Sequence, residues 1–327
     1  MSAAKIGVLI GGAAPVEGEA AGDAVVAALR EAGRDAVPVH LGPGIDTVRA
    51  LDAARIDLAF LALEGRLAEE GCVQGLLEVL GIPYTGSSVM SSALALDKLK
   101  SKELFRLHNV PTPPYYTLDG AAALAGIADV HGSFGFPVVV KPRREGSSVG
   151  VSRAGTMTEL VASLEQAMAH DESVIVERFI AAREVHVAIL NGRVLGGVEV
   201  MRGTGGQGAS AIAAPAERLS PIRYRGILNL GERAAQALDA TGPVRVDVLV
   251  TEGQNEYVLD VNTHPSLAPG ALLPRMAAEV GFCFSDLCLA IADAARLHTA
   301  SAARRPVRVA RLPEAPRVTP ETAVRVA

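Results

Sequence analysis

The chain has 327 residues, a hydrophobic content of 49% and a formal net charge of −5. This small charge and the dispersed basic residues argue against a nucleic-acid partner and favour a small-molecule one. The apolar runs are shorter than a membrane span and the N-terminus lacks a signal-peptide pattern, so we expect a cytoplasmic protein without a membrane partner. Cys72, Cys283 and Cys288 show neither metal-ligand spacing nor an even disulfide set, and we interpret them as reduced packing residues.

The first part of the chain alternates strand and helix patterns. Strands are predicted at residues 5–10, 35–39 and 57–62, and helices at residues 20–32 and 47–55. The alternation predicts an α/β fold with a mainly parallel sheet, in an N-terminal Rossmann-like domain over residues 1–87. Gly11 and Gly12 lack the full G-x-G-x-x-G pattern, so a nicotinamide site is the weaker interpretation.

Two α+β units are predicted to follow. The second domain, residues 88–180, is predicted to begin in one long helix over residues 87–108. It then continues through strands at 136–141, 149–152 and 173–176 and a helix at 157–169. The third domain, residues 181–298, contains further strands and a helix around 227–240. Residues 299–327 are rich in Ala, Arg, Pro and Val without a period, and we predict a disordered tail.

Two short runs near residue 250 carry polar side chains on alternate positions. A turn-rich spacer between them predicts an antiparallel hairpin. A turn centred between residues 253 and 254 sets Asp247 opposite Asp260 and Arg245 opposite Asn262. Facing carboxylates repel each other, and their oxygen atoms suit Mg²⁺. The alternative is a solvated hairpin face on which the charges never meet.

Two other polar blocks precede this hairpin. Lys141 ends a strand and is followed by a glycine loop containing Ser147, whose amides and hydroxyls suit a phosphate group. Glu177 follows the strand predicted at residues 173–176. The apolar residues up to Ile180 could form one side of an adenine pocket, with Glu184 near the ribose. Each block alone has an ordinary alternative, a polar hairpin for the first and a charged strand end for the second.

The order of these blocks resembles that of the ATP-grasp ligases, and residues 5–290 resemble the D-alanine:D-alanine ligases. The runs that carry the resemblance are GLLEVLGIPYTGS (75–87), ALALDK (93–98), VKPRREGSSVG (140–150) and LDVNT (259–263). The resemblance implies an ATP-grasp fold and an ATP-dependent ligase of the peptidoglycan pathway. Such an enzyme joins amino acids through an acyl phosphate and is expected to be a homodimer.

The resemblance also implies roles for single residues. ATP would be held by Lys98, Lys141, Glu177, Arg178, Phe179, Ile180 and Glu184. Two Mg²⁺ ions, with Mn²⁺ as an alternative, would be held by Asp247, Asp260 and Asn262. The catalytic set would be Glu17, Ser147 and Arg245, and the substrate pocket would include Glu64, Ser266 and Leu272.

The chain departs from the family pattern on the substrate side. Glu17 takes the place of the glutamate that binds the first amino acid only if one residue is inserted, and Glu64 replaces a histidine. The flap between residues 200 and 215 is short, rich in glycine and without the family's Lys-Tyr pair. Ser266 replaces a glycine, and Ala271 replaces a serine that binds the second substrate's carboxylate.

These departures leave three functional hypotheses. The leading one is D-alanine:D-alanine ligation. The second is the same chemistry on another amino acid or amine in a specialised small-molecule pathway, and the third is an ATP-binding protein without ligase activity. We interpret His264, beside the metal strand, as a solvated loop residue rather than a ligand.

Overall fold

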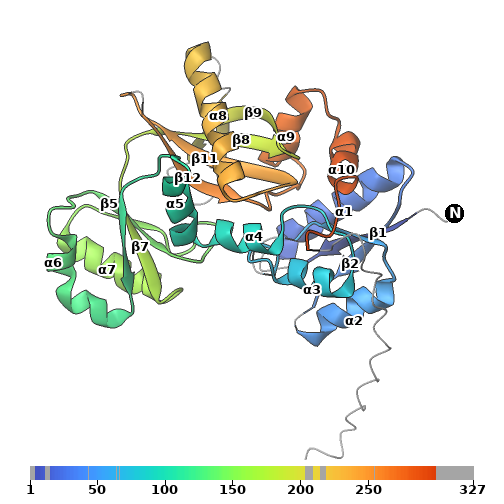
Figure 1. Cartoon of the computed structure of the whole chain (residues 1–327), viewed down its shortest axis with the longest axis horizontal. Helices are drawn as coiled ribbons and strands as arrows, with labels where there is room; N and C mark the ends of the chain where they lie inside the picture. The colour runs from blue at the N-terminus through green and yellow to red at the C-terminus, as the bar shows by residue number, and fades with distance from the viewer. Residues whose placement is uncertain are drawn as a thin grey trace, which may run out of the picture.

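The computed structural model describes residues 4–11, 15–42, 44–63, 65, 67–202, 209–213, 219–253 and 255–299. Their strands form sheets of three, four and five strands. In Figure 1 the four-stranded sheet and the three-stranded sheet lie at opposite ends of the molecule, with the five-stranded sheet between them. None of the helices in these ranges is long and apolar enough to cross a membrane.

The three-stranded sheet is parallel, as the alternating pattern predicts. The central strand β1 pairs with β2 on one side and β3 on the other. Its apolar run is almost fully buried, which is typical of a parallel strand covered on both faces. The elements here are β1 (Lys5–Ile10), α1 (Pro15–Glu31), β2 (Asp35–His40), α2 (Ile45–Ala54), β3 (Leu58–Leu61) and α3 (Cys72–Leu80).

The single long helix predicted over residues 87–108 is wrong, because the chain forms two helices that meet at Asp97. These are α4 (Val89–Leu96) and α5 (Lys98–Leu107). The Asp97 side chain accepts a hydrogen bond from the Lys100 backbone and caps α5. Both of its oxygens also bind the Arg143 guanidinium, at 2.8 and 2.7 Å. An aspartate with these two sets of partners favours a cap over a helix interior.

The four-stranded sheet is antiparallel, in the order β4-β7-β5-β6. Its elements are β4 (Tyr115–Asp119), η1 (Ala121–Gly126), α6 (Ile127–His131), β5 (Val138–Pro142), β6 (Ser152–Ala154), α7 (Met157–Met168) and β7 (Ser173–Arg178). Strand β6 starts three residues later than residues 149–152 predict. Residues 149–151 belong instead to the preceding loop. In that loop Ser147 and Ser148 have positive φ angles of 48° and 61°.

The five-stranded sheet is antiparallel, in the order β10-β9-β8-β11-β12. Its elements are β8 (Arg183–Leu190), β9 (Arg193–Arg202), β10 (Ala209–Ala213), α8 (Pro221–Ala237), β11 (Pro243–Val250) and β12 (Glu256–Asn262). Helix α8 begins earlier than predicted because the Ser220 side chain caps it and Pro221 takes its first turn.

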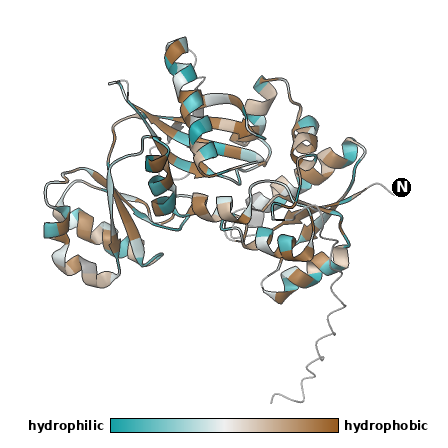
Figure 2. Ribbon diagram, in the orientation of Figure 1, coloured by the Kyte–Doolittle hydropathy of each residue, from teal (hydrophilic) through white to brown (hydrophobic). Residues whose placement is uncertain are grey.

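The last two helices are α9 (Leu272–Glu279) and α10 (Phe284–Ala292), and they pack in a core shared by the five-stranded and the three-stranded sheets. In Figure 1 α10 lies beside α1, and one core cluster contains Val8 of β1, Leu190 of β8 and Leu287 of α10. Figure 2 shows hydrophobic residues on the strands and helices around all three sheets, β1 and its neighbours among them. The three sheets fall within the predicted ranges 1–87, 88–180 and 181–298, whose boundaries stay predictions. The predicted tail lies outside the described residues from residue 300 on.

Candidate active site

The hairpin of β11 and β12 brings the predicted polar residues together. Arg245 pairs with Asn262 and Asp247 with Asp260, as predicted. The register shifts between Asp247 and Val248, however, and nearer the turn Val248 pairs with Val258. One extra residue on β12, a β-bulge, therefore lies between the turn and Asp260. The predicted pairing depends on this bulge as well as on the position of the turn.

The two facing carboxylates differ in their surroundings. Asp247 is buried, and both its oxygens accept hydrogen bonds from Arg245, at 2.8 and 3.1 Å. At Asp260, burial raises the pKa above its ordinary value and the negative Asp247 raises it further, while Lys98 opposes both effects. A buried carboxylate beside a second one fits a divalent cation, because a cation would remove the cost of ionising both. Asp247, Asp260 and the Asn262 amide oxygen therefore suit Mg²⁺ in donor type.

Behind the hairpin, Glu177 binds two lysines at the end of β7. Its carboxylate oxygens lie 3.1 Å from Lys102 Nζ and 2.8 Å from Lys141 Nζ, and all three side chains are buried. Burial alone would raise the pKa of Glu177, but the two ammonium groups outweigh it and lower the pKa to about 2. This carboxylate is occupied by lysines, so any adenine contact at Glu177 would have to come from its backbone.

Sequence reasoning missed Lys102. Its ammonium group also donates a 2.6 Å hydrogen bond to Thr112 and lies 5.4 Å from the centre of the Tyr115 ring. Lys98 and Lys102 are four residues apart on α5 and share a helix face. This spacing is the sequence signal that could have identified Lys102. Lys98 itself donates to the Glu145 carbonyl, and burial lowers its pKa while Asp260 opposes the shift.

Beside these groups lies a cleft of about 1170 Å³, whose lining does not include Glu177, Lys102, Lys141 or Asp247. The lining includes these predicted residues: Lys98, Ser147, Arg245, Asp260, Asn262 and Ser266. Further polar residues of the lining include Glu69, Glu70, Arg144 and His170. The Ser147 loop approaches the opposite wall so closely that a Cβ at Gly146 would lie 2.5 Å from Glu69 Oε2. The cleft is large enough for a nucleotide together with small substrates.

The predicted ribose residue Glu184 is connected to the metal strand through His186. His186 Nε2 lies 2.7 Å from Glu184 Oε1 and 3.5 Å from Asp247 Oδ1. His186 pairs directly with Asp247 across β8 and β11, and Glu184 lies two residues away on the same face of β8. This link was not predicted, because it depends on which strand lies next to β11.

Two of the residues predicted around the adenine, Arg178 and Phe179, contact other side chains of the four-stranded sheet region. Arg178 donates to the Phe134 carbonyl and lies 5.3 Å from that ring's centre, and the Arg153 guanidinium stacks 4.0 Å from the Phe179 ring centre. Leu272, predicted in the substrate pocket, begins α9 and packs against the core shared with β1, and it is not among the residues that line the cleft. The adenine and ribose assignments stay predictions.

Several predicted positions lie outside the described residues. The backbone of Glu17 belongs to the first turn of α1, but its side chain is not described, and neither is Glu64. Residues 203–208 and 214 of the predicted flap, and residues 215–218 after it, are also not described.

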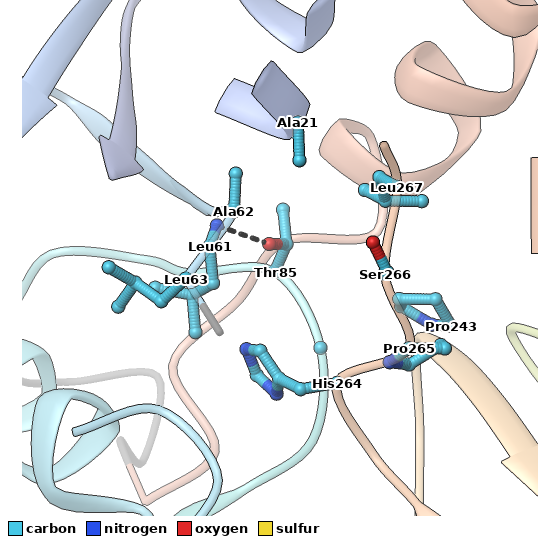
Figure 3. Close-up of a pocket in the computed structure, with 11 residues that line it drawn as sticks. Ala21, Leu61, Ala62, Leu63, Thr85, Pro243, His264, Pro265, Ser266 and Leu267 are labelled. Carbon is cyan, nitrogen blue, oxygen red and sulfur yellow. Dashed lines mark hydrogen bonds between the residues drawn. The ribbon is translucent and has the colours of Figure 1, made fainter. Parts of the chain in front are cut away.

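His264 is buried, which contradicts our prediction of a solvated loop residue. Burial lowers its pKa to about 4. It borders both the large cleft and a separate cavity of about 20 Å³. Figure 3 shows its ring reaching from the loop after β12 toward Leu63, with Ala21 across the cavity. The sequence could not show this, because the burial comes from packing against the end of β3 and the segment at Gly86.

The chain is similar in sequence to D-alanine–D-alanine ligases. The family model "D-ala D-ala ligase C-terminus" matches residues 104–293. A D-alanine–D-alanine ligase from Geobacter sulfurreducens is 43% identical, over 90% of this chain and 94% of its own length. One from Stutzerimonas stutzeri is 38% identical, over 88% and 93%. This chain belongs to the D-alanine–D-alanine ligase family.

Solved structures agree on the fold. The Bacillus anthracis D-alanine–D-alanine ligase, crystallised with ATP, superposes with a TM-score of 0.79 at 31% identity and covers 89% of this chain and 97% of its own. The VanG D-Ala:D-Ser ligase of Enterococcus faecalis gives a TM-score of 0.78 at 25% identity, with 89% and 98% covered. The predicted α/β class and ATP-grasp fold are therefore confirmed.

Proposed function

We propose that this protein is an ATP-dependent carboxylate–amine ligase that joins two molecules of D-alanine. The observation that carries the proposal is the single cleft in which Lys98, Arg245 and Asp260 meet, in a chain of this family. Cations for phosphates and oxygen ligands for Mg²⁺ converge there, as phosphoryl transfer to a carboxylate requires.

The reaction has two balanced steps. A carboxylate oxygen of the first D-alanine attacks the γ-phosphorus of ATP, the bond to the β-phosphate oxygen breaks, and ADP leaves with an acyl phosphate remaining. The amine of the second D-alanine then attacks the acyl carbon, inorganic phosphate leaves, and the amine nitrogen loses a proton to give the dipeptide. Activation precedes amide formation because a free carboxylate is a poor electrophile.

This chain's residues supply position and charge. Lys98 faces the cleft toward Asp260 and would hold phosphate oxygens, while Lys141 is fixed behind it by Glu177. Arg245 lines the cleft from a fixed orientation on Asp247 and would stabilise charge on the transferred phosphoryl group. Asp247, Asp260 and Asn262 would hold Mg²⁺, which when bound neutralises phosphate charge.

The proposal extends to Ser147 and Glu17. Ser147 lies on the cleft wall, where it would contact the acyl phosphate or the first substrate. The role of Glu17 as the ammonium anchor rests on the resemblance. A cytoplasmic location, the peptidoglycan pathway and a homodimer likewise follow from the family.

The alternative of a different amino acid keeps some support. Ala271 is the N-cap residue of α9 and has no side-chain hydrogen bond there, and its methyl side chain cannot donate one to a second substrate's carboxylate. An enzyme of the same mechanism with another acceptor would be compatible with this residue.

The test is phosphate release from Mg²⁺-ATP with D- and L-amino acids, singly and in pairs. Release with D-alanine alone, with D-alanyl-D-alanine identified as the product, is expected. Release only with another pair would refute the substrate and keep the mechanism. ATP binding without release across the panel would favour the non-catalytic hypothesis.

A further inference from the structure

The small cavity beside the cleft is bordered by the loop after the metal strand. His264 and Ser266 border both spaces, and the His264 backbone donates a 2.7 Å hydrogen bond to Asn262 Oδ1. A carboxylate that accepts a phosphoryl group must lie next to the metal strand. The cavity is therefore placed to receive the side chain of the substrate that carries this carboxylate.

The volume of the cavity limits that side chain. About 20 Å³ holds roughly one water molecule or one methyl group. Its lining is mostly apolar and includes Ala21, Leu61, Leu63 and Leu267. Ala21 belongs to α1, four residues after the predicted ammonium anchor Glu17 in sequence.

Hydrogen bonds fix the far walls of the cavity. The Thr85 hydroxyl oxygen accepts from the Leu61 backbone at 3.0 Å, as Figure 3 shows. Thr241 donates a 3.0 Å hydrogen bond to the Gly86 carbonyl, and a Cβ at Gly242 would lie 2.5 Å from Gly86 Cα. These contacts hold residues 85–86 in place on that side of the cavity, and another residue closes the remaining side.

His264 closes that side, and its chemistry is unusual for an apolar cavity. Its side chain is only 9% exposed, and among the described residues its Nδ1 atom has no hydrogen-bond partner. A buried ring nitrogen without a partner carries a desolvation cost that a bound water or a ligand hydroxyl would remove. This observation points to a ligand independently of the cavity's volume.

We propose that His264 is a specificity-determining residue that closes the side-chain pocket of the activated amino acid. It restricts this substrate to alanine- or serine-sized side chains. The inference rests on the proposed function and adds the residue that sets the size limit. Its ring nitrogen further favours a hydroxymethyl side chain over an ethyl side chain of nearly equal size.

The test isolates the first substrate. Single D-amino acids are supplied with Mg²⁺-ATP and excess hydroxylamine, which attacks the acyl phosphate to give a hydroxamate and releases phosphate. The wild-type protein should use D-alanine at least about tenfold better than D-2-aminobutyrate, because one methylene group beyond the pocket is worth about 10- to 100-fold. D-Serine should be used better than D-2-aminobutyrate.

Two variants separate size from hydrogen bonding. His264→Ala should raise the ratio of D-2-aminobutyrate to D-alanine use by about tenfold. His264→Leu fills the space without a ring nitrogen, so it should keep the size limit and lose the preference for D-serine. His131→Ala is the matched control, because His131 is also buried with an unpartnered ring nitrogen but packs against Tyr116 and Phe136, away from the cleft.

The outcomes distinguish this inference from the proposed function. Absence of hydroxamate with every D-amino acid in the wild type would refute the ligase proposal itself. Wild-type activity with D-alanine and an unchanged ratio in a folded His264→Ala variant would overturn the role of His264 alone. If His264→Ala does not fold, equal wild-type use of D-alanine and D-2-aminobutyrate would still overturn it.

Discussion

Behind the proposed nucleotide side of the cleft, Glu177 lies between Lys102 and Lys141, and every one of these buried charges has an oppositely charged partner. On the proposed amino-acid side, His264 has a buried ring nitrogen without a hydrogen-bond partner among the described residues, next to an apolar cavity. The opposite charges of the first arrangement are paired before any ligand binds, whereas the ring nitrogen of the second would gain a partner from a water or a ligand. The comparison contrasts a pre-paired charge cluster behind the proposed nucleotide site with a polar group left open at the proposed substrate site.

The metal strand between these regions should show the largest effect on activity. Asp260→Ala removes a ligand of the predicted Mg²⁺ site, and we expect phosphate release to fall by about 10³-fold. Because burial and Asp247 both disfavour the charged form of Asp260, its removal should leave the melting temperature unchanged or higher. Phosphate release and thermal unfolding measured on the same preparation check both statements. A loss of activity that merely tracks unfolding would contradict a functional role.

The paired charges of the nucleotide side predict a large effect on stability. Glu177→Gln leaves Lys102 and Lys141 buried without a negative partner, and we expect a loss of about 3–5 kcal/mol in the free energy of unfolding. Urea titration measures it. Glu103→Gln breaks the exposed pair with Lys100 and is the control, with an expected change below about 0.5 kcal/mol. Similar losses in both variants would show that burial does not matter here.

Replacement of Asp97, which caps α5, should have an intermediate effect on both the free energy of unfolding and ATP binding. Asp97→Ala removes the cap of α5 and the partner of Arg143, which should cost about 1–2 kcal/mol of stability. Lys98 is the next residue, so the KM for ATP should also rise severalfold. Asp46→Ala, which breaks an exposed pair with Arg49, should change neither quantity. A stability loss with an unchanged KM would limit Asp97 to a structural role.

Features that depend on local periodicity are predictable from the sequence. Alternation predicts that Arg245 and Asp247 share one face of β11, whereas the direct pairing of Asp247 with Asp260 also depends on the bulge in β12. The break at Asp97 was missed because its second partner, Arg143, is 46 residues away. The burial of His264 was mispredicted for the same reason, since Leu63 and Gly86 are distant in sequence. Lys102 was within reach, because its spacing from Lys98 is a local signal.

The smallest predicted effect tests whether the two sides of the cleft are connected through His186. Its imidazole lies between Glu184 and Asp247, so it should orient the proposed ribose contact relative to the metal strand without contacting the reacting atoms. His186→Asn should therefore raise the KM for ATP about three- to fivefold and leave kcat within about twofold, because a positioning residue mainly changes ground-state binding. His40→Asn, at the exposed end of β2, is the control. An equal fall in kcat and kcat/KM would instead place His186 in transition-state stabilisation, and the contrast between a pre-paired nucleotide side and a substrate side left open would then fail at this residue.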